Sequence, residues 1–345
     1  MRILLTGVAG FIGYSYASQI SNESISVLGI DNINDYYDVE LKLSRLKNLG
    51  FNPHECLEYK KKLKSKSYPN IEFVRADLQD LDFLLKLWNQ FQPTHVVHLA
   101  AQAGVRYSLD HPEKYISSNV SGTLNILEGA RKNSIEHLLF ASSSSVYGLN
   151  TKQPFSVKDP VDHPISLYAS TKRSAELIAH SYSHLFKVPC TALRFFTVYG
   201  PWGRPDMALF LFAKAILNEK PIDVFNHGNM SRDFTYIDDI TTALHKIIQI
   251  PPIETNTEYP STSTAPYHIY NIGNSQPVKL MDFIKEIEFA TGKEAILNFK
   301  DLQPGDVEST CADVNDLFEK FNFRPNTKIK DGVKKFVSWY TEYYK

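Results

Sequence analysis

The chain has few cysteines, and their spacing excludes several kinds of site. Cys56, Cys190 and Cys311 lie far apart, with no CxxC pair and no metal-ligand spacing. A metal site built on cysteine is therefore not expected. We expect three buried or incidental thiols in a reducing, cytoplasmic compartment.

The chain also lacks an excess of charge of one sign and a long apolar run. Its 37 Lys and Arg residues face 38 Asp and Glu residues, so no basic surplus favours a nucleic-acid partner. No run approaches the roughly 18 apolar residues of a spanning helix, and MRILLTG is too short for a signal-peptide core. We expect no membrane association. With 345 residues, 43% of them hydrophobic, the chain can form a substantial core.

Short apolar segments alternate with longer amphipathic ones in the first half of the chain. Strands are predicted at 2–5, 25–30, 71–75, 95–99, 137–141 and 191–196, and helices at 13–21, 81–90, 119–133 and 166–186. This alternation predicts βαβ units, and nearly continuous hydrophobicity suits strands buried on both faces. We expect an α/β fold with a Rossmann-like, doubly wound parallel sheet.

Two segments interrupt this pattern, and the pattern loosens from about residue 195. Residues 51–70 form a polar insertion, predicted to be a solvated loop or short helix, and residues 251–266 are predicted to be an exposed loop. The later Pro- and Gly-rich segments suggest a smaller, interleaved C-terminal α/β domain that accepts a ligand. The expected domains are 1–192 with about 233–250, and 193–232 with 251–345.

A glycine-rich turn follows the first strand and opens the first helix. Gly7, Gly10 and Gly13 would let backbone N–H groups approach a diphosphate. Asp31 ends the second strand, where a carboxylate would bind an adenosine ribose and repel a 2′-phosphate. NAD is therefore favoured over NADP. Asp77 after the third strand either meets the adenine or caps the next helix.

A tyrosine and a lysine lie one helical turn apart in the second half of this region. Tyr168 and Lys172 share one face of a predicted helix, so the ammonium group would help the phenol to act as a general base. Residues 142–145 are four serines that follow a predicted central strand. Their hydroxyls would lie at the carboxyl end of the sheet, where ligands bind.

With these motifs the whole chain resembles the extended short-chain dehydrogenase/reductase family, specifically its nucleotide-sugar epimerases. The similar segments are TGVAGFIG, HLAAQAGVRYS, SSSSVYG, the Tyr168–Lys172 pair and RDFTYIDD. The resemblance implies NAD in the larger domain and a UDP-sugar in the smaller, in a homodimer paired through helices 119–133 and 166–186. The implied NAD-binding residues are Gly7, Gly10, Phe11, Ile12, Gly13, Asp31, Asn32, Asp77, Leu78, Leu99, Ala100, Ala101, Asn119, Tyr168 and Lys172.

The resemblance also implies a catalytic triad of Ser143, Tyr168 and Lys172. Tyr168 would take the proton of the sugar 4-hydroxyl as hydride passes from C4 to NAD. Lys172 would hold the nicotinamide ribose and lower the tyrosine pKa, and Ser143 would bind the 4-oxygen. The 4-keto sugar would turn over before hydride returns, so NAD is recycled and stays bound.

The choice of sugar rests on a second group of positions. Dehydratases of the family carry Asp-Glu where Ser144 and Ser145 stand, which disfavours elimination. Residues 194–207 are similar to the segment found in UDP-glucuronate 4-epimerases, whereas UDP-galactose 4-epimerases usually carry Asn at Thr197. The resemblance implies that Ser144, Ser145, Thr197 and Arg204 surround a uronate carboxylate. Arg204 would be its charged partner, or else a surface or phosphate-binding arginine.

Holding the carboxylate has a chemical purpose, because a 4-keto uronate is a β-keto acid. Such an acid loses CO2 when its C5–C6 bond lies perpendicular to the carbonyl plane. A carboxylate fixed in another orientation would allow epimerisation without decarboxylation.

Other positions match the nucleotide end of the substrate site. The resemblance assigns Arg232 to the diphosphate and Asp306 to the uridine ribose, while Gln303 replaces a usual arginine. Phe225 either packs on uracil or lies in the core, and Arg106 either reaches the substrate or lies at the surface. Thr310 is small enough to keep N-acetylated sugars possible. His98 is expected to pack at a strand end, and no metal is expected.

The sequence therefore predicts an isomerase, an NAD-dependent UDP-sugar 4-epimerase that converts UDP-glucuronate to UDP-galacturonate in polysaccharide biosynthesis. One alternative is a 4-epimerase of neutral sugars, either UDP-glucose/galactose or UDP-N-acetylglucosamine/galactosamine. Another is a non-catalytic NAD-binding regulator, which should show a broken Tyr/Lys pair.

Overall fold

The computed structural model describes residues 1–254, 263–303 and 305–345, which form two compact units. The first unit comprises 1–150, 157–194 and 244–270, and the second comprises 151–156, 195–243 and 271–345. Compared with the expected domains, residues 151–156 and 233–243 lie in the second unit, and residues 193–194 and 251–270 lie in the first. That NAD binds one unit and the sugar nucleotide the other stays a prediction.

The first unit is built on one eight-stranded sheet with the order β11-β7-β6-β5-β1-β2-β4-β3. Its strands are β1 (Arg2–Thr6), β2 (Ser26–Asp31), β3 (Lys62–Lys64), β4 (Ile71–Arg75), β5 (His95–His98), β6 (His137–Ser143), β7 (Cys190–Phe195) and β11 (Tyr267–Ile272). β1 pairs in parallel with both β2 and β5, placing Leu4 opposite Leu28 and Val96. The strand order reverses at β1, which confirms the predicted doubly wound sheet and places its switch point between β1 and β5.

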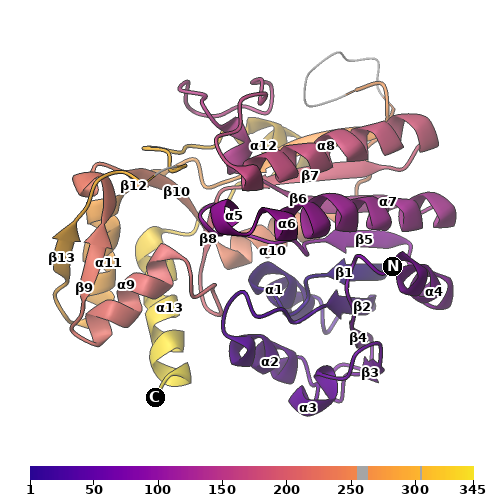
Figure 1. Cartoon of the computed structure of the whole chain (residues 1–345), viewed down its shortest axis with the longest axis horizontal. Coiled ribbons are helices and arrows are strands. Elements are labelled where there is room, and N and C mark those ends of the chain that lie inside the picture. Colours follow the sequence, from indigo (N-terminus) through magenta and orange to yellow (C-terminus); the bar gives the residue numbers. More distant parts are fainter. Residues whose placement is uncertain (255–262, 304) are drawn as a thin grey trace. The chain divides into compact units, whose positions relative to one another are not determined.

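The main helices of this unit agree with the predicted ones. They are α1 (Phe11–Gln19), α4 (Leu81–Phe91), α7 (Gly122–Asn133) and α8 (Leu167–Phe186). α7 and α8 lie side by side and pack against one another (Figure 1). The helix predicted from residue 119 differs at its start, because residues Ile116–Ser121 form a π-helical turn before α7.

Shorter helices complete the first unit. They are α2 (Val39–Asn48), α3 (Pro53–Cys56), α5 (Tyr107–Asp110), α6 (Pro112–Tyr115) and the 3-10 turn Ser144–Tyr147, while α10 (Ile237–Ile248) crosses the boundary between the units. α2 was not predicted. Its buried leucines are surrounded by charged residues, so its apolar face is weak in the sequence.

The insertion at 51–70 is more ordered than a loop. It contains the short helix α3, as one interpretation expected, but residues 62–64 form the edge strand β3, antiparallel to β4. Leu63 is buried opposite Phe73, and the Lys62 ammonium lies 2.7 Å from the Glu72 carboxylate. Lysines on both sides of one buried residue are typical of an edge strand. Of the predicted loop at 251–266, residues 255–262 lie outside the described residues.

The second unit contains two small sheets, with orders β12-β10-β8 and β13-β9. Their strands are β8 (Thr197–Tyr199), β9 (Pro221–Val224), β10 (Ser231–Tyr236), β12 (Pro277–Lys279) and β13 (Ile296–Phe299). The helical elements are α9 (Ala208–Leu217), the 3-10 turn Phe225–Gly228, α11 (Leu280–Thr291), α12 (Asn315–Phe321) and α13 (Ile329–Tyr343). α11 packs against both α9 and α13.

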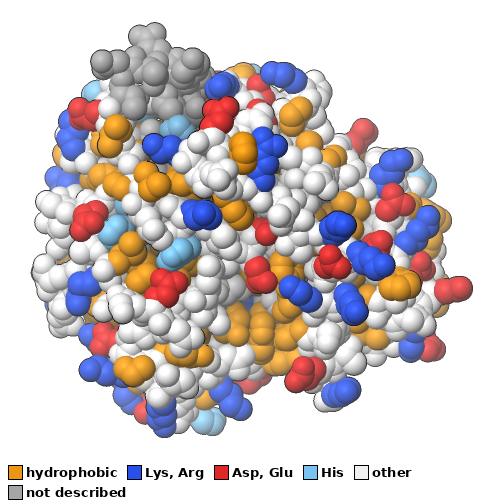
Figure 2. All heavy atoms as spheres, turned by 180° about the vertical axis from the view of Figure 1, so that it is seen from behind, with side chains coloured by type: hydrophobic (Ala, Val, Ile, Leu, Met, Phe, Trp, Pro, Cys, Tyr) orange, Lys and Arg blue, Asp and Glu red, His pale blue; other side chains and the backbone are white. Residues whose placement is uncertain are grey.

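The cysteines are free thiols, as expected, and charged side chains of both signs are mixed on the surface. Cys56 and Cys190 are buried free thiols, Cys311 is partly buried, and burial raises the pKa of Cys56 to about 12. Figure 2 shows Lys and Arg side chains interspersed with Asp and Glu over the face it displays. In the part of the chain that the structure describes, no helix is both long and apolar enough to span a bilayer.

Candidate active site

The glycine-rich turn lies directly against the residues that follow β5. Gly7 has a φ of +76°, and a Cβ there would lie 2.8 Å from the Ala100 nitrogen. A side chain at Gly13 would overlap the Gly7 carbonyl. Gly10 is the N-cap of α1 and has no side chain to cap the helix, so the first N–H groups of α1 can donate to an anion. This backbone fits the diphosphate of a dinucleotide.

Two carboxylates lie at the ends of the neighbouring strands. Asp31 accepts hydrogen bonds from the backbone N–H of Ala9 (3.0 Å) and of Ile33 (2.8 Å), which fixes it beside the glycine-rich turn. Asp77 accepts from the Asn32 side chain at 3.1 Å, so the loops after β2 and β4 are joined. The alternative that Asp77 caps the next helix is wrong, because Asp80 caps α4.

Asn119 connects the loop after β5 to helix α8. Its Oδ1 accepts from the Gln102 N–H (2.7 Å), and its amide donates to the Gln102 carbonyl and the Thr171 hydroxyl, both at 3.0 Å. Both amide hydrogens are thus used within the protein. Asn119 therefore joins Gln102, in the loop after β5, to Thr171, the residue before Lys172 on α8.

The predicted catalytic residues lie on two elements that pack together, α8 and the end of β6. The buried Lys172 donates to the Ala141 carbonyl at 2.9 Å, which ties α8 to β6. The Ser143 hydroxyl donates to the Ser145 hydroxyl at 3.1 Å. The Tyr168 ring meets the edge of Tyr115 with centroids 6.2 Å apart.

A buried ion pair beneath these residues was not found from the sequence. Glu176, one turn beyond Lys172 on α8, accepts two hydrogen bonds from Arg194 of β7, both at 2.9 Å. It also accepts from Ser142 at 2.6 Å, and the Arg194 guanidinium lies 5.0 Å from the centre of the Tyr147 ring. Glu176 and Arg194 are almost completely buried. The i, i+4 spacing from Lys172 was visible in the sequence, but the partner on β7 was not.

This pair predicts a stability loss in acid. Burial alone would raise the pKa of Glu176, but the charge and hydrogen bonds of Arg194 outweigh it and hold that pKa below its ordinary value. The folded state then binds fewer protons than the unfolded state, so the stabilisation is present above the ordinary pKa of about 4.3 and is lost as pH falls toward the folded value. Glu176→Gln should lower the free energy of unfolding at pH 7 by about 3 kcal/mol, because Arg194 loses its counter-charge.

Urea unfolding between pH 3 and pH 7 measures this effect. The variant should show a smaller fall in stability between pH 5 and pH 3 than the wild type. The exposed Glu342→Gln serves as the matched control and should follow the wild type. A variant with the wild-type pH profile would contradict the role of this pair.

His98 is buried at the end of β5, where the sequence predicted it to pack. Its Nδ1 lies 2.7 Å from the Thr6 hydroxyl and its Nε2 lies 3.1 Å from the Thr123 hydroxyl. Burial lowers the pKa of His98 to about 3. Among the described residues, no group of three or more His, Cys, Asp or Glu side chains could hold a metal ion.

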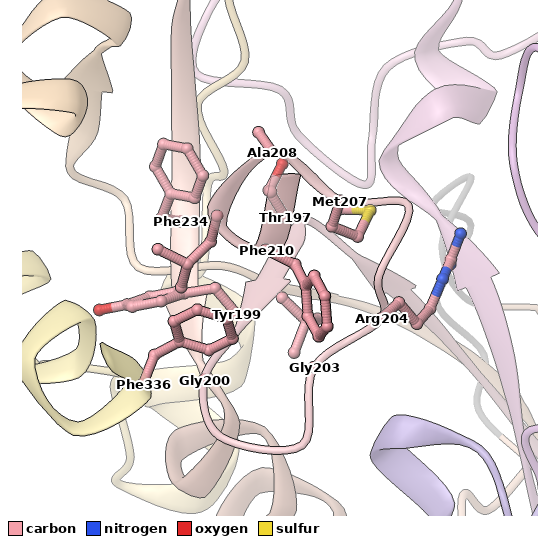
Figure 3. A pocket seen from close by; sticks show the side chains of 12 residues that line it. Thr197, Tyr199, Gly200, Gly203, Arg204, Met207, Ala208, Phe210, Phe234 and Phe336 are labelled. Carbon is pink, nitrogen blue, oxygen red and sulfur yellow. The ribbon is translucent and has the colours of Figure 1, made fainter. Parts of the chain in front are cut away.

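In the second unit, Thr197 and Arg204 line one pocket together with Met207, Phe210 and Phe336. Figure 3 shows the rings of Phe210 and Phe336 in its apolar part and the Arg204 side chain extending away from them. The pocket is therefore mainly apolar, with Thr197 and Arg204 among the residues that line it and the Arg204 guanidinium directed away from the rings.

The Arg204 side chain forms a forked ion pair that the sequence reasoning missed. Its Nε and Nη2 donate to the two oxygens of Asp206 at 3.0 and 2.5 Å. Two parallel hydrogen bonds fix the plane of the guanidinium. An acidic residue two positions after the predicted arginine was the available signal.

The predicted nucleotide residues lie around β10. The Arg232 guanidinium donates to the carbonyls of Ser231 (2.9 Å) and Glu308 (3.1 Å). Burial lowers the pKa of Arg232 and the charge of Asp306 opposes this shift, so the predicted phosphate and ribose residues interact electrostatically. Asp233, next to Arg232, is fully buried and accepts from the backbone of Asn274, Ser275 and Ala312, which fixes the adjoining loops.

The remaining predicted substrate residues differ in exposure. Phe225 is half-buried in its 3-10 turn, so it does not lie in the core, and Arg106 is exposed before α5. Ser144 and Ser145 are half-buried in the turn after β6. Thr310 is buried, and its hydroxyl accepts from the Asp233 N–H at 3.1 Å.

Comparisons with known proteins identify the family of this chain. Residues 3–273 match the NAD dependent epimerase/dehydratase family. The chain is 53% identical to Protein CapI of Staphylococcus aureus, covering 100% of both chains. It is 45% identical to a probable UDP-glucuronate 4-epimerase of Rhizobium meliloti, covering 100% of this chain and 98% of that one.

Among solved structures, the chain is similar to UDP-glucuronic acid 4-epimerase from Bacillus cereus, crystallised with UDP-glucuronic acid and NAD. The TM-score is 0.86 and the identity 31%, with 100% of both chains covered. A UDP-glucose 4-epimerase from Thermotoga maritima with UDP-glucose gives a TM-score of 0.84 at 25% identity. The predicted resemblance is confirmed, and the chain belongs to the NAD dependent epimerase/dehydratase family.

Proposed function

We propose that this protein is an NAD-dependent UDP-glucuronate 4-epimerase that interconverts UDP-glucuronate and UDP-galacturonate. The observation that carries the choice of sugar is the pocket that Thr197 and Arg204 line together. Asp206 binds the Nε/Nη2 edge of the Arg204 guanidinium and fixes its plane, so a uronate carboxylate would accept from the other edge of the group. A neutral hexose carries no such carboxylate. The relatives named for UDP-glucuronate support the same substrate.

The first unit has the features that NAD needs. The bare backbone of the glycine-rich turn and the start of α1 would hold the diphosphate, and Asp31 would bind the adenosine ribose. We assign Phe11, Ile12, Leu78 and residues 99–101 to the walls around the cofactor. When bound, NAD supplies the oxidation and the later reduction of C4.

Residues at the end of β6 and the start of α8 carry out the proton transfers. Tyr168 accepts the proton of the 4-hydroxyl, and the nearby Lys172 ammonium stabilises the phenolate. Ser143 donates to the 4-oxygen once its single hydroxyl hydrogen turns away from the Ser145 hydroxyl oxygen, which lies 3.1 Å from it. After the 4-keto sugar has turned over, so that C4 is reduced on its opposite face, Tyr168 returns the proton to the 4-oxygen.

The second unit is assigned most of the contacts to the rest of the substrate. Arg204 pairs with the uronate carboxylate, and Thr197, Ser144 and Ser145 supply hydroxyl groups to it. We assign Arg232 to the diphosphate and Asp306 to the uridine ribose. Phe225, which is half-buried, is assigned to uracil. Arg106, exposed before α5, is a further candidate for substrate contact.

The substrate is tested by incubating the purified protein, without added NAD, with UDP-glucuronate, UDP-glucose and UDP-N-acetylglucosamine in separate reactions. Chromatography of the products should show UDP-galacturonate in the first reaction and little conversion in the others. Turnover of neutral sugars alone would contradict the choice of substrate. No turnover of any sugar would favour a non-catalytic NAD-binding protein.

We also propose that the protein acts in the cytoplasm as a homodimer that pairs through α7 and α8. Both helices carry exposed leucines: Leu124 on α7 and Leu177 and Leu185 on α8. Burying such side chains in a partner would remove apolar surface from water.

The dimer is tested by Leu177→Glu. A buried charge at the interface should shift the protein from dimer to monomer in sedimentation or light scattering. Leu211→Glu on α9 is the matched control, because Leu211 is 50% exposed and Leu177 is 53% exposed. A variant at Leu177 with the mass of the wild type would argue against this interface.

A further inference from the structure

Two loops of the first unit meet through aromatic side chains. Tyr36 follows β2, and Tyr107 begins α5 after β5. Their rings lie 4.9 Å apart between centroids, at an angle of 57°. Gly104, also after β5, has a φ of +98° and packs so closely on the Tyr36 hydroxyl that any side chain there would overlap it. The two loops are therefore in direct contact.

Because of the strand order, the contact between Tyr36 and Tyr107 crosses over the end of β1. β1 lies between β2 and β5 in the sheet. Since neighbouring strands are about 4.8 Å apart, the two loops leave the sheet about 10 Å from one another. Dinucleotides bind in the crevice at the carboxyl ends of such strands, at the switch point. The Tyr36–Tyr107 contact therefore spans the place where the glycine-rich turn would hold NAD.

Each end of this contact is anchored in its own loop. The Asn34 side chain accepts from the Tyr36 N–H at 3.4 Å and from the Lys42 ammonium at 2.6 Å. On the other side, the hydroxyl of the buried Tyr115 donates to the carbonyls of Ala103 and Gly104. Because hydrogen bonds hold each loop separately, the ring contact between the loops can resist their separation.

We propose that Tyr36 and Tyr107 form a strap that retains NAD between turnovers. This inference rests on the proposed function, in which each catalytic cycle regenerates the same NAD molecule. An enzyme of this kind gains nothing from exchanging its cofactor. For NAD to leave the crevice, the two rings must separate, so their contact slows release.

The test measures the rate at which bound NAD leaves the purified holoprotein. Tyr36→Ala, Tyr107→Ala and the double variant are mixed with an excess of an NAD-consuming enzyme that destroys released cofactor. Loss of one aromatic contact should make release about threefold to tenfold faster. The double variant should be no faster than the faster single variant, because both changes remove the same contact.

Phenylalanine variants are the matched controls. Tyr36→Phe and Tyr107→Phe keep both rings, although the second loses a 2.7 Å bond from the Lys114 ammonium, and both should release NAD like the wild type. Tyr107 also packs on His111, so Tyr36→Ala alone carries the test if Tyr107→Ala does not fold.

Three results would overturn the strap: unchanged release from Tyr36→Ala, Phe variants as fast as the Ala variants, or single effects that multiply in the double variant. A wild-type protein that binds no NAD would overturn the proposed function itself. The strap alone would be refuted if the wild type holds NAD and epimerises UDP-glucuronate while the variants release NAD as slowly as the wild type.

Discussion

Tyr168→Phe should lower the rate of UDP-glucuronate epimerisation by about 10²- to 10⁴-fold, because the ring remains and the proton acceptor is lost. The variant should fold normally, since Tyr168 contacts Tyr115 through its ring, which phenylalanine retains. It should also keep its bound NAD. The measurement is kcat by product chromatography, with the NAD content of the purified variant determined in parallel.

Tyr182→Phe is the matched control for this change. Tyr182 lies on the same helix, α8, and its hydroxyl donates to Glu128 at 2.6 Å, outside the proposed active site. It should retain nearly full activity. If Tyr168→Phe kept more than about a tenth of the wild-type rate, Tyr168 would not be the general base.

Arg204→Ala should raise the KM for UDP-glucuronate by about 10- to 100-fold, because a hydrogen-bonded charge pair with the carboxylate is lost. The rise in KM should exceed that expected from losing the Arg204–carboxylate pair alone. The Asp206 carboxylate would remain near the uronate without its partner and would repel it. Activity toward UDP-glucose, however weak, should not fall in proportion. Released CO2 and a UDP-pentose should increase, because the 4-keto acid is no longer held in an unreactive orientation.

The substitution Asp206→Asn separates the loss of the Arg204–uronate pair from the repulsion between the Asp206 carboxylate and the uronate. The double variant Arg204→Ala/Asp206→Asn should bind UDP-glucuronate better than Arg204→Ala alone, because the repulsive carboxylate is gone. Steady-state kinetics with both substrates, together with CO2 trapping, gives the comparison. An unchanged KM for UDP-glucuronate and no extra CO2 in Arg204→Ala would refute the carboxylate clamp.

The sequence predicted the parts of the fold whose signals are local. Buried parallel strands are nearly continuous apolar runs, and the long helix α8 has its apolar residues at helical spacing, so both were found close to their bounds. α2 was missed because charged residues dilute its apolar face. β3 was missed because three residues with one buried leucine give almost no periodicity.

The site was predictable where the chemistry lies within a short motif. The glycine-rich turn, the Tyr168–Lys172 pair and the serines after β6 are each contiguous or one helical turn apart. Contacts between distant segments could not be read in the same way. Glu176 meets Arg194 only because the fold brings α8 and β7 together. Tyr36 meets Tyr107 only because their strands, β2 and β5, both flank β1 in the sheet.

The central claim is that C4 is oxidised and reduced within the site, with no exchange of carbon-bound hydrogen with water. The most direct test is to incubate the holoprotein with UDP-glucuronate in D2O and to analyse the sugar by NMR. The account predicts UDP-galacturonate that carries protium at both C4 and C5. Deuterium at C5 would indicate deprotonation of that carbon, and deuterium at C4, or the absence of the 4-epimer, would contradict the account.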